Sequence, residues 1–214
     1  MNIMETKSCV IMLTPAMSKR LIALGICQQD CLKERLKKGI VVINAGTTNG
    51  YVAEAVLESL GYDIGPLKSR MIRGVILPPD SKVEKAENAD IVIIDGKWEK
   101  DLTFEDVLDR ISAGDIIIKG GNAVNPRTGD VGVLIGHPQG GTVGRVIRAA
   151  YGRRARILAP VGLEKRVDAP ITDIMELIND PEATGLRMGH LPGKAYTEIE
   201  AISDLTCADA VLVG

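Results

Sequence analysis

IVVINAGTTNG, residues 40–50, joins a run of β-branched residues to a polar turn that lies between two glycines. The run at 40–44 predicts a buried strand, and the residues that follow at 51–60 predict a helix. A strand, a short turn and a helix in this order are typical of a parallel sheet whose strands are joined by crossover helices. The sequence around residue 40 therefore predicts an α/β fold.

The same alternation of apolar runs and helical stretches continues along the chain. It predicts further strands at residues 73–77, 90–94, 115–118, 156–159 and 208–213. It predicts further helices at residues 16–24, 30–38, 104–111, 142–151 and 171–178. Together these elements predict a three-layer α/β sandwich with a mostly parallel central sheet, in a Rossmann-like arrangement.

We expect one domain made of three parts. Residues 1–39 form leading helices packed on the domain, residues 40–167 form the core, and residues 168–214 complete the same domain. A DNA-binding helix-turn-helix is the alternative for the leading helices, which Gly25 separates, but only 39 residues precede the first strand and leave little room for a third helix. The Gly- and Pro-rich residues 180–193 predict a surface excursion or a small subdomain.

The composition is that of an ordinary globular protein. Of the 214 residues, 45% are apolar and 25% are charged, which excludes disorder, a collagen-like chain and a disulfide scaffold. The 26 Lys and Arg against 28 Asp and Glu give a formal charge of -2, so no basic field is present to hold nucleic acid. Aromatic residues make up only 3% of the chain, too few for a platform that stacks bases. We expect an aliphatic core and no nucleic-acid partner.

No apolar run approaches the roughly 20 residues that span a bilayer, so we expect no membrane partner. The first residues lack the features of a secretory leader, which predicts a cytoplasmic protein. The four cysteines are Cys9, Cys27, Cys31 and Cys207. Cys27 and Cys31 are four residues apart and would share a helix face, but no second pair and no nearby histidine completes a tetrahedral metal site. We expect buried free thiols, no metal, no cofactor and, from the fold class, a homo-oligomer.

The turn Gly46-Thr47-Thr48-Asn49-Gly50 is the first candidate binding site. It places backbone N–H groups, hydroxyls and a helix N-terminus at the carboxyl end of a strand, where an anion is stabilised by the donors and by the helix dipole together. This arrangement suits a phosphate or a carboxylate. The alternative is that Thr48 or Asn49 only caps the helix.

A second glycine-rich turn precedes a helix that carries two arginines, Arg145 and Arg148. Its sequence is Gly136-His137-Pro138-Gln139-Gly140-Gly141-Thr142. The turn is similar to a phosphate cradle, in which Gly140, Gly141, Thr142 and Arg145 are the candidate ligand contacts. It lacks the lysine of a nucleotide P-loop, because Thr142 stands at that position, so hydrolysis of ATP or GTP through this turn is not supported. A structural turn made by glycine alone is the alternative.

Lys119-Gly120-Gly121-Asn122 follows the predicted strand at 115–118. A lysine that ends a parallel strand points into the crevice where open α/β sheets bind ligands. Lys119 is suited to hold a phosphate or to neutralise a developing enolate, and Gly120, Gly121 and Asn122 are candidate ligand contacts beside it. The alternative is a solvated lysine.

Several side chains are candidates for moving a proton. Asp130 and His137 lie near the glycine-rich segments. The chain has two histidines, His137 and His190, and a histidine is more often a surface or capping residue than a catalyst. Glu198 and Glu200 alternate on a late apolar stretch, so on a strand they would face the same side and either would serve as a base. Simple solvation of these carboxylates is the alternative.

Parts of the chain resemble a known superfamily. Residues 36–50 resemble the opening of ribose-5-phosphate isomerase, where a helix, a glycine and a strand lead to a phosphate loop, and residues 118–121 look like its lysine–glycine segment. The layout of residues 115–160 is similar to that of methylthioribose-1-phosphate isomerase and of the regulatory subunits of the translation initiation guanine-exchange factor. These proteins belong to the superfamily of isomerases, CoA transferases and initiation-factor relatives, which implies a sugar-phosphate ligand.

The resemblance implies roles for single residues. Those that match the phosphate loop and the later Gly-Thr are Thr47, Thr48, Asn49, Gly141 and Thr142. Lys119 matches the lysine of ribose-5-phosphate isomerase. Asn122 stands where methylthioribose-1-phosphate isomerase has a catalytic aspartate, and Asp130 lies in a different context from the glutamate base of the other isomerase.

Three functions are consistent with these patterns. The first is an enzyme that binds a phosphorylated sugar or similar small acid and isomerises it by proton transfer next to a carbonyl; Lys119 would hold the enediolate oxygen and Asp130, His137 or Glu198 would move the proton. The second is a non-catalytic binding or regulatory protein that keeps the anion site. The third is a CoA transferase with Glu198 as its nucleophilic carboxylate.

Overall fold

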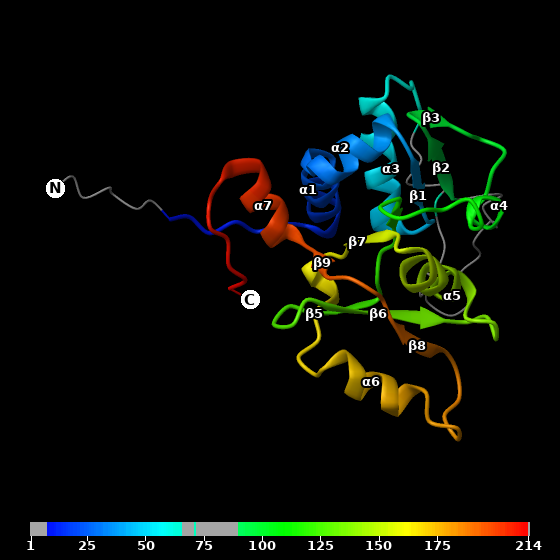
Figure 1. Cartoon of the computed structure of the whole chain (residues 1–214). Helices are drawn as coiled ribbons and strands as arrows, with labels where there is room; N and C mark the ends of the chain where they lie inside the picture. The colour runs from blue at the N-terminus through cyan, green and yellow to red at the C-terminus, as the bar shows by residue number, and fades with distance from the viewer. Residues whose placement is uncertain (1–7, 66–70, 72–89, 214) are drawn as a thin grey trace.

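The computed structural model describes residues 8–65, 71 and 90–213. Its centre is a mostly parallel sheet of six strands in the order β3-β2-β1-β4-β7-β9 (Figure 1). The strands that run parallel are β1 (Ile40–Ile43), β4 (Ile116–Ile118), β7 (Arg156–Pro160) and β9 (Ala195–Tyr196). The antiparallel edge is formed by β2 (Ile91–Ile94) and β3 (Lys97–Trp98). The described residues thus confirm the α/β class.

Helices cover both faces of this sheet, because side chains alternate along a strand. On β1, Val41 and Ile43 enter one apolar core with α1, α2 and α3, whereas Ile40 and Val42 enter a second core with α4 and α5. The α-helices of the described residues are α1 (Pro15–Gln28), α2 (Asp30–Lys37), α3 (Thr47–Ser59), α4 (Phe104–Val107), α5 (Gly141–Ile147), α6 (Ile171–Ile178) and α7 (Glu198–Thr206).

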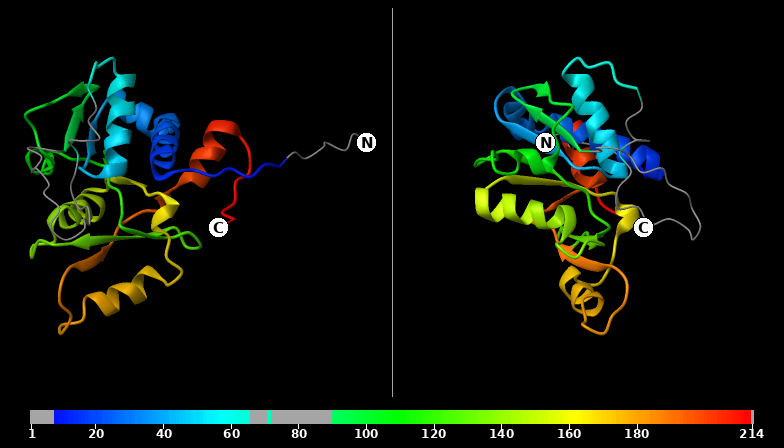
Figure 2. Two further views of the ribbon diagram at one scale, coloured as in Figure 1. Left: turned by 180° about the vertical axis from the view of Figure 1, so that it is seen from behind. Right: turned by 90° about the vertical axis from the view of Figure 1, so that its right-hand side faces the viewer.

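A second, antiparallel sheet lies between the six-stranded sheet and α6, as two directions of view show (Figure 1, Figure 2). Its strands, in the order β5-β6-β8, are β5 (Ala123–Asn125), β6 (Asp130–Ile135) and β8 (Arg187–His190). Val131 and Val133 of β6 enter the second core, and Met188 of β8 packs on Ile171 of α6. The sequence did not indicate this sheet, because its strands are short and two of them contain a glycine.

Most of the predicted elements are present. The strands expected at 40–44, 90–94, 115–118 and 156–159 are β1, β2, β4 and β7, although β2 runs antiparallel to β1. The helix expected at 142–151 is α5 followed by a π-helical turn at Arg148–Gly152. The helix expected at 104–111 is shorter and ends as α4 at Val107. The strand expected at 73–77 lies outside the described residues.

Two expectations about the end of the chain are wrong. Residues 208–213 form no strand, and two of their valines are 80% exposed, because β9 already pairs with β7 at this edge. Glu198 and Glu200 do not alternate on a strand; they lie in the first turn of α7. Thr197 and Glu200 form a capping box there, a pattern that signals the start of a helix.

The break between the leading helices also lies elsewhere than expected. Gly25 is inside α1, where a Cβ atom would lie 2.9 Å from the Cα of Ala201, so the missing side chain lets α7 pack closely on α1. The chain turns instead at Gln29, between α1 and α2. The two leading helices pack within the fold, since α1 contacts both α3 and α7.

The described cysteines are free thiols, but they are not all buried. Cys27 and Cys31 are half-buried on either side of the turn at Gln29, whereas Cys9 and Cys207 are exposed. Burial raises the pKa of the Cys27 thiol to about 11. Among the described residues, no group of His, Cys, Asp and Glu side chains is placed to hold a metal ion. No helix in the described part of the chain is long and apolar enough to cross a membrane.

Candidate functional site

A cavity of about 620 Å³ opens at the carboxyl ends of β1 and β4. Three segments that are far apart in the sequence meet there, because the carboxyl ends of neighbouring parallel strands share one edge of a sheet. They are the residues after β1, the residues after β4 and the turn between β6 and α5. Predicted site residues that line the cavity are Gly46, Thr47, Thr48, Asn49, Lys119, Gly120, Gly121, Asn122, His137, Gly140, Gly141 and Thr142.

The first turn of α3 forms one end of the cavity. The helix begins at Thr47, so the polar turn predicted before the helix is in fact the helix N-terminus. Gly46 occupies the N-cap position and no side chain caps the helix. The alternative that Thr48 or Asn49 serves as the cap is therefore wrong. The first turn holds no acidic residue, so the partial positive charge of the helix dipole faces the cavity without a local counter-charge.

Buried polar atoms without partners gather at this end. Thr48 is 3% exposed and Asn49 is 1% exposed, yet the Thr48 Oγ1 and the Asn49 Oδ1 have no hydrogen-bond partner among the described residues. The side chain of the neighbouring Asn44 is likewise buried and unpartnered within that part of the chain. Buried polar atoms in native proteins are almost always paired, so a cluster of orphans beside a cavity indicates that a ligand or ordered water completes the site.

Asn49 also holds the two central strands together at this edge. Its Nδ2 donates to the Asn44 carbonyl oxygen at 2.7 Å and to the Ile118 carbonyl oxygen at 3.2 Å. These bonds fix the amide so that its unpartnered oxygen lies beside Gly120, where an added Cβ would stand 3.4 Å from it. The amide oxygen is a pure acceptor, and it therefore needs an O–H or N–H group from whatever fills the cavity.

Two lysines bring positive charge to the cavity wall. The Lys119 Nζ donates to the Gly120 carbonyl oxygen at 2.9 Å, and the Lys165 Nζ donates to the Gly121 carbonyl oxygen at 2.8 Å. Burial lowers the pKa of Lys165 below its usual value, and Lys19 adds to this effect whereas the nearby carboxylate of Glu164 opposes it. The described residues that line the cavity include no Asp or Glu. The arrangement attracts an anion and offers it N–H and O–H donors.

The turn before α5 forms the opposite wall. Gly140 has φ 79° and Gly141 has φ 53°, a left-handed conformation that favours glycine. His137 is held within this turn, because its Nδ1 accepts a hydrogen bond from the Gln139 N–H at 3.2 Å. In the neutral ring the proton then resides on Nε2. Among the described residues that line the cavity, His137 supplies the imidazole. The residues of β6 that line the cavity beside it are aliphatic.

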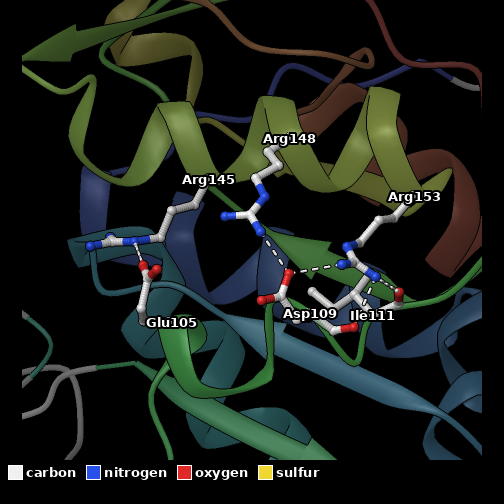
Figure 3. Close-up of polar contacts among 6 residues, drawn as sticks. All are labelled: Glu105, Asp109, Ile111, Arg145, Arg148 and Arg153. Carbon is white, nitrogen blue, oxygen red and sulfur yellow. Dashed lines mark hydrogen bonds and ion pairs between the residues drawn. The ribbon is translucent and has the colours of Figure 1, made fainter.

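Arg145 does not line this cavity, although other residues of its helix, α5, do. It lines a neighbouring cavity of about 680 Å³ together with Arg148, and both arginines point toward α4 (Figure 3). Arg145 is paired with Glu105, and the Arg148 Nη2 lies 2.6 Å from an Asp109 carboxylate oxygen. These ion pairs direct the guanidinium groups toward α4 and away from the first cavity. The structure therefore places Arg145 outside the set of ligand contacts that surrounds the first cavity.

Two of the predicted proton carriers also lie elsewhere. Asp130 starts β6, at the end remote from His137, and accepts a hydrogen bond from Lys194 at 2.9 Å. This bond, with others nearby, holds the pKa of Asp130 below its usual range. Glu198 is 7% exposed and does not line the cavity. Neither carboxylate is placed to act on a ligand bound there, because both are occupied in linking parts of the fold.

Glu198 instead anchors the segment that carries Lys165. Its two carboxylate oxygens accept hydrogen bonds from the Leu163 N–H at 3.0 and 3.1 Å, and one of them also accepts from the buried Ser18 hydroxyl. Leu163 starts a short 3₁₀-helix, Leu163–Lys165, that follows β7. Lys165 was not predicted. It lies in the 3₁₀-helix after β7 and not directly at the end of that strand, so the strand-end argument used for Lys119 does not identify it.

No family model, characterised protein or solved structure matches this chain. The chemistry of the cavity is therefore what indicates a function. It combines an uncapped helix N-terminus, an unpartnered buried hydroxyl, two lysines and one histidine with an aliphatic wall that includes Leu134, Ile135 and Leu186. This combination suits a small anionic ligand with a carbon skeleton.

Proposed function

We propose that the protein binds a small phosphorylated metabolite, a sugar phosphate, in the cavity at the ends of β1 and β4. The observation that carries this proposal is the buried, unpartnered Thr48 hydroxyl in the first turn of the uncapped helix α3. A phosphate oxygen there would accept from the hydroxyl and from the backbone N–H groups of the turn, and it would be favoured by the helix dipole. Lys119, which lines the same cavity, supplies counter-charge.

The orphan amide oxygen favours a sugar over an apolar phosphate ester. The Asn49 Oδ1 accepts hydrogen bonds only, and a sugar hydroxyl is a donor that satisfies it. Leaving such an acceptor unpaired would cost about 1–3 kcal/mol, so a ligand that supplies the donor binds more tightly than one that does not. As part of the same proposal, we infer a Rossmann-like three-layer fold of the kind found in the sugar-phosphate isomerases that the sequence resembles.

Isomerisation next to a carbonyl is the second candidate function. It is favoured by one observation, which is that His137 and Lys119 line the same cavity. His137 would carry the proton and Lys119 would hold the developing oxyanion. Asp130 and Glu198 are not needed for this scheme. A CoA transferase is less well supported, because Glu198, its expected nucleophile, is buried under the Leu163 N–H and lies outside the cavity lining.

Ligand binding tests the first function directly. Ribose 5-phosphate, ribose and inorganic phosphate are compared by thermal shift and titration calorimetry, since a ligand that binds the native state raises its apparent stability. We expect ribose 5-phosphate to bind most tightly, inorganic phosphate weakly and ribose not at all. Equal shifts with ribose and ribose 5-phosphate would contradict a phosphate site.

Solvent exchange separates an enzyme from a binding protein. In D₂O, an isomerase that acts through His137 incorporates deuterium at the carbon next to the carbonyl, which NMR detects, and the His137→Asn variant does not. If the protein binds ribose 5-phosphate without any incorporation, the non-catalytic function holds for this ligand.

A further inference from the structure

Lys165 is partly buried in the wall of the cavity. Its Nζ donates at 2.8 Å to a neutral acceptor, the Gly121 carbonyl oxygen. Among the described residues, the cavity wall places no carboxylate against it. Glu164, its neighbour in the chain, is the one acid that acts on it appreciably, and Lys19 acts in the opposite sense. Burial without a carboxylate partner favours the uncharged amine, which is the nucleophilic form of lysine.

The backbone that carries Lys165 is fixed on both sides. On one side, the Leu163 N–H is held by both carboxylate oxygens of Glu198, at 3.0 and 3.1 Å. On the other side, Arg166 pairs with Val124 of β5 through an isolated bridge. A lysine on a flexible surface loop is a poor catalyst because its amine samples many positions. Here the fold keeps the amine at the wall of a cavity that also contains the α3 N-terminus.

We propose that Lys165 forms an imine with the carbonyl carbon of a phosphorylated aldehyde or ketone bound in this cavity. This inference rests on the proposed phosphate site, and it adds a covalent step that binding alone does not require. A desolvated lysine in an apolar surrounding is activated as a nucleophile toward carbonyl groups. The phosphate held at the first turn of α3 would keep the small substrate in the cavity while the amine attacks.

The step is balanced without any oxidant or reductant. The Lys165 Nζ lone pair forms a bond to the carbonyl carbon, and the π electron pair moves to the carbonyl oxygen, which takes up a proton. The nitrogen loses one proton, which gives a neutral carbinolamine. Loss of the hydroxyl group as water, with one further proton supplied from solvent and one released from nitrogen, gives the imine. The reaction is reversible, so hydrolysis returns the free lysine.

Reductive trapping tests the proposal on the whole protein. The chain is incubated with glyceraldehyde 3-phosphate, or with glyceraldehyde as the unphosphorylated control, and treated with sodium cyanoborohydride, which converts an imine to a stable secondary amine. Peptide mass mapping then locates the adduct. We expect one adduct, on Lys165, that forms at least tenfold more with the phosphorylated aldehyde and that excess inorganic phosphate suppresses. Adducts spread over exposed lysines, or one placed mainly on Lys119, would overturn the proposal.

Two variants make the test specific. Lys165→Arg keeps a long hydrogen-bond-donating side chain but has no nucleophilic amine, so we expect the phosphate-dependent adduct to disappear. Lys194→Arg is the matched control, because Lys194 is an exposed lysine that bonds Asp130 away from the cavity, and trapping should be unchanged. Since the adduct is mapped on the wild-type chain as well, the result does not depend on whether the Lys165→Arg variant folds.

A separate measurement distinguishes failure of this inference from failure of the proposed function. Calorimetry of the wild-type protein with ribose 5-phosphate reports on the phosphate site without any covalent step. Binding without a Lys165 adduct would refute the imine and leave the binding function intact. Absence of both would refute the two together.

Discussion

Replacing Thr48 by valine tests two effects of its unpartnered hydroxyl. The first is the stability that the hydroxyl costs the free protein, and the second is the phosphate affinity that it contributes. Thr48 is 3% exposed and its Oγ1 has no hydrogen-bond partner among the described residues. Valine has nearly the same shape and a similar helix propensity, so the change removes the hydroxyl and little else. The variant should therefore be more stable than the wild type in the absence of ligand, and it should bind phosphate less well.

The size of both effects follows from the burial. An unpaired buried hydroxyl costs about 1–3 kcal/mol, and we expect Thr48→Val to raise the free energy of unfolding by roughly 1–2 kcal/mol. For a chain of this length each kcal/mol corresponds to roughly 2–4 °C in Tm. A hydrogen bond to a charged phosphate contributes about 1.5–3 kcal/mol, so affinity for ribose 5-phosphate should fall roughly 10- to 100-fold.

The assay is urea unfolding without ligand, combined with calorimetry against ribose 5-phosphate. Thr197→Val is the matched control, because Thr197 is also buried but its hydroxyl accepts from the Ile199 N–H and belongs to the capping box of α7. That variant should lose about 0.5–2 kcal/mol of stability and bind the sugar phosphate as the wild type does. A Thr48→Val protein that is less stable than wild type and binds with unchanged affinity would refute the reasoning.

Three further changes have defined outcomes. Glu198→Ala should lower the free energy of unfolding in urea by roughly 2–5 kcal/mol, because it leaves the Leu163 N–H and a serine hydroxyl unpaired; a neutral result would mean that Glu198 is not an anchor. Lys119→Ala should weaken ribose 5-phosphate binding in calorimetry while urea unfolding stays unchanged. Lys194 lowers the pKa of Asp130, so the stability from this carboxylate is present above pH 3.8 and lost as the pH falls further. Asp130→Asn should therefore flatten the acid unfolding curve and leave sugar-phosphate binding at neutral pH intact.

The candidate site was largely accessible from the sequence because of how parallel strands are arranged. Residues after β1 and after β4 are far apart in the sequence, with β2 and β3 between them, yet they meet because both strands end at one edge of the sheet. Short polar and glycine-rich segments directly after apolar runs therefore predicted Thr48, Asn49 and Lys119, which line one cavity in the structure. Lys165 was not found in this way, because it lies in the 3₁₀-helix beyond the end of β7 and reaches the cavity only through the tertiary structure.

Side chains with distant partners lie elsewhere than the local sequence suggested. Glu198 has the chemistry of a base, but Ser18 and the Leu163 N–H, which the fold brings to it, make it a buried anchor. Arg145 follows a cradle-like turn, but Glu105 of α4 engages its guanidinium group in the neighbouring cavity. Local sequence contains the chemistry of a side chain but not the identity of its neighbours.

The sequence by itself determined the alternation of strands and helices, since periodic burial is a local property that each segment expresses in its own residues. Only the tertiary structure decided the antiparallel direction of β2, the second sheet and the missing strand at 208–213. Pairing between strands depends on which edges are still open when the chain returns, and this is a property of the whole assembly. For the same reason, only the tertiary structure showed that the Thr48 hydroxyl is buried without a partner.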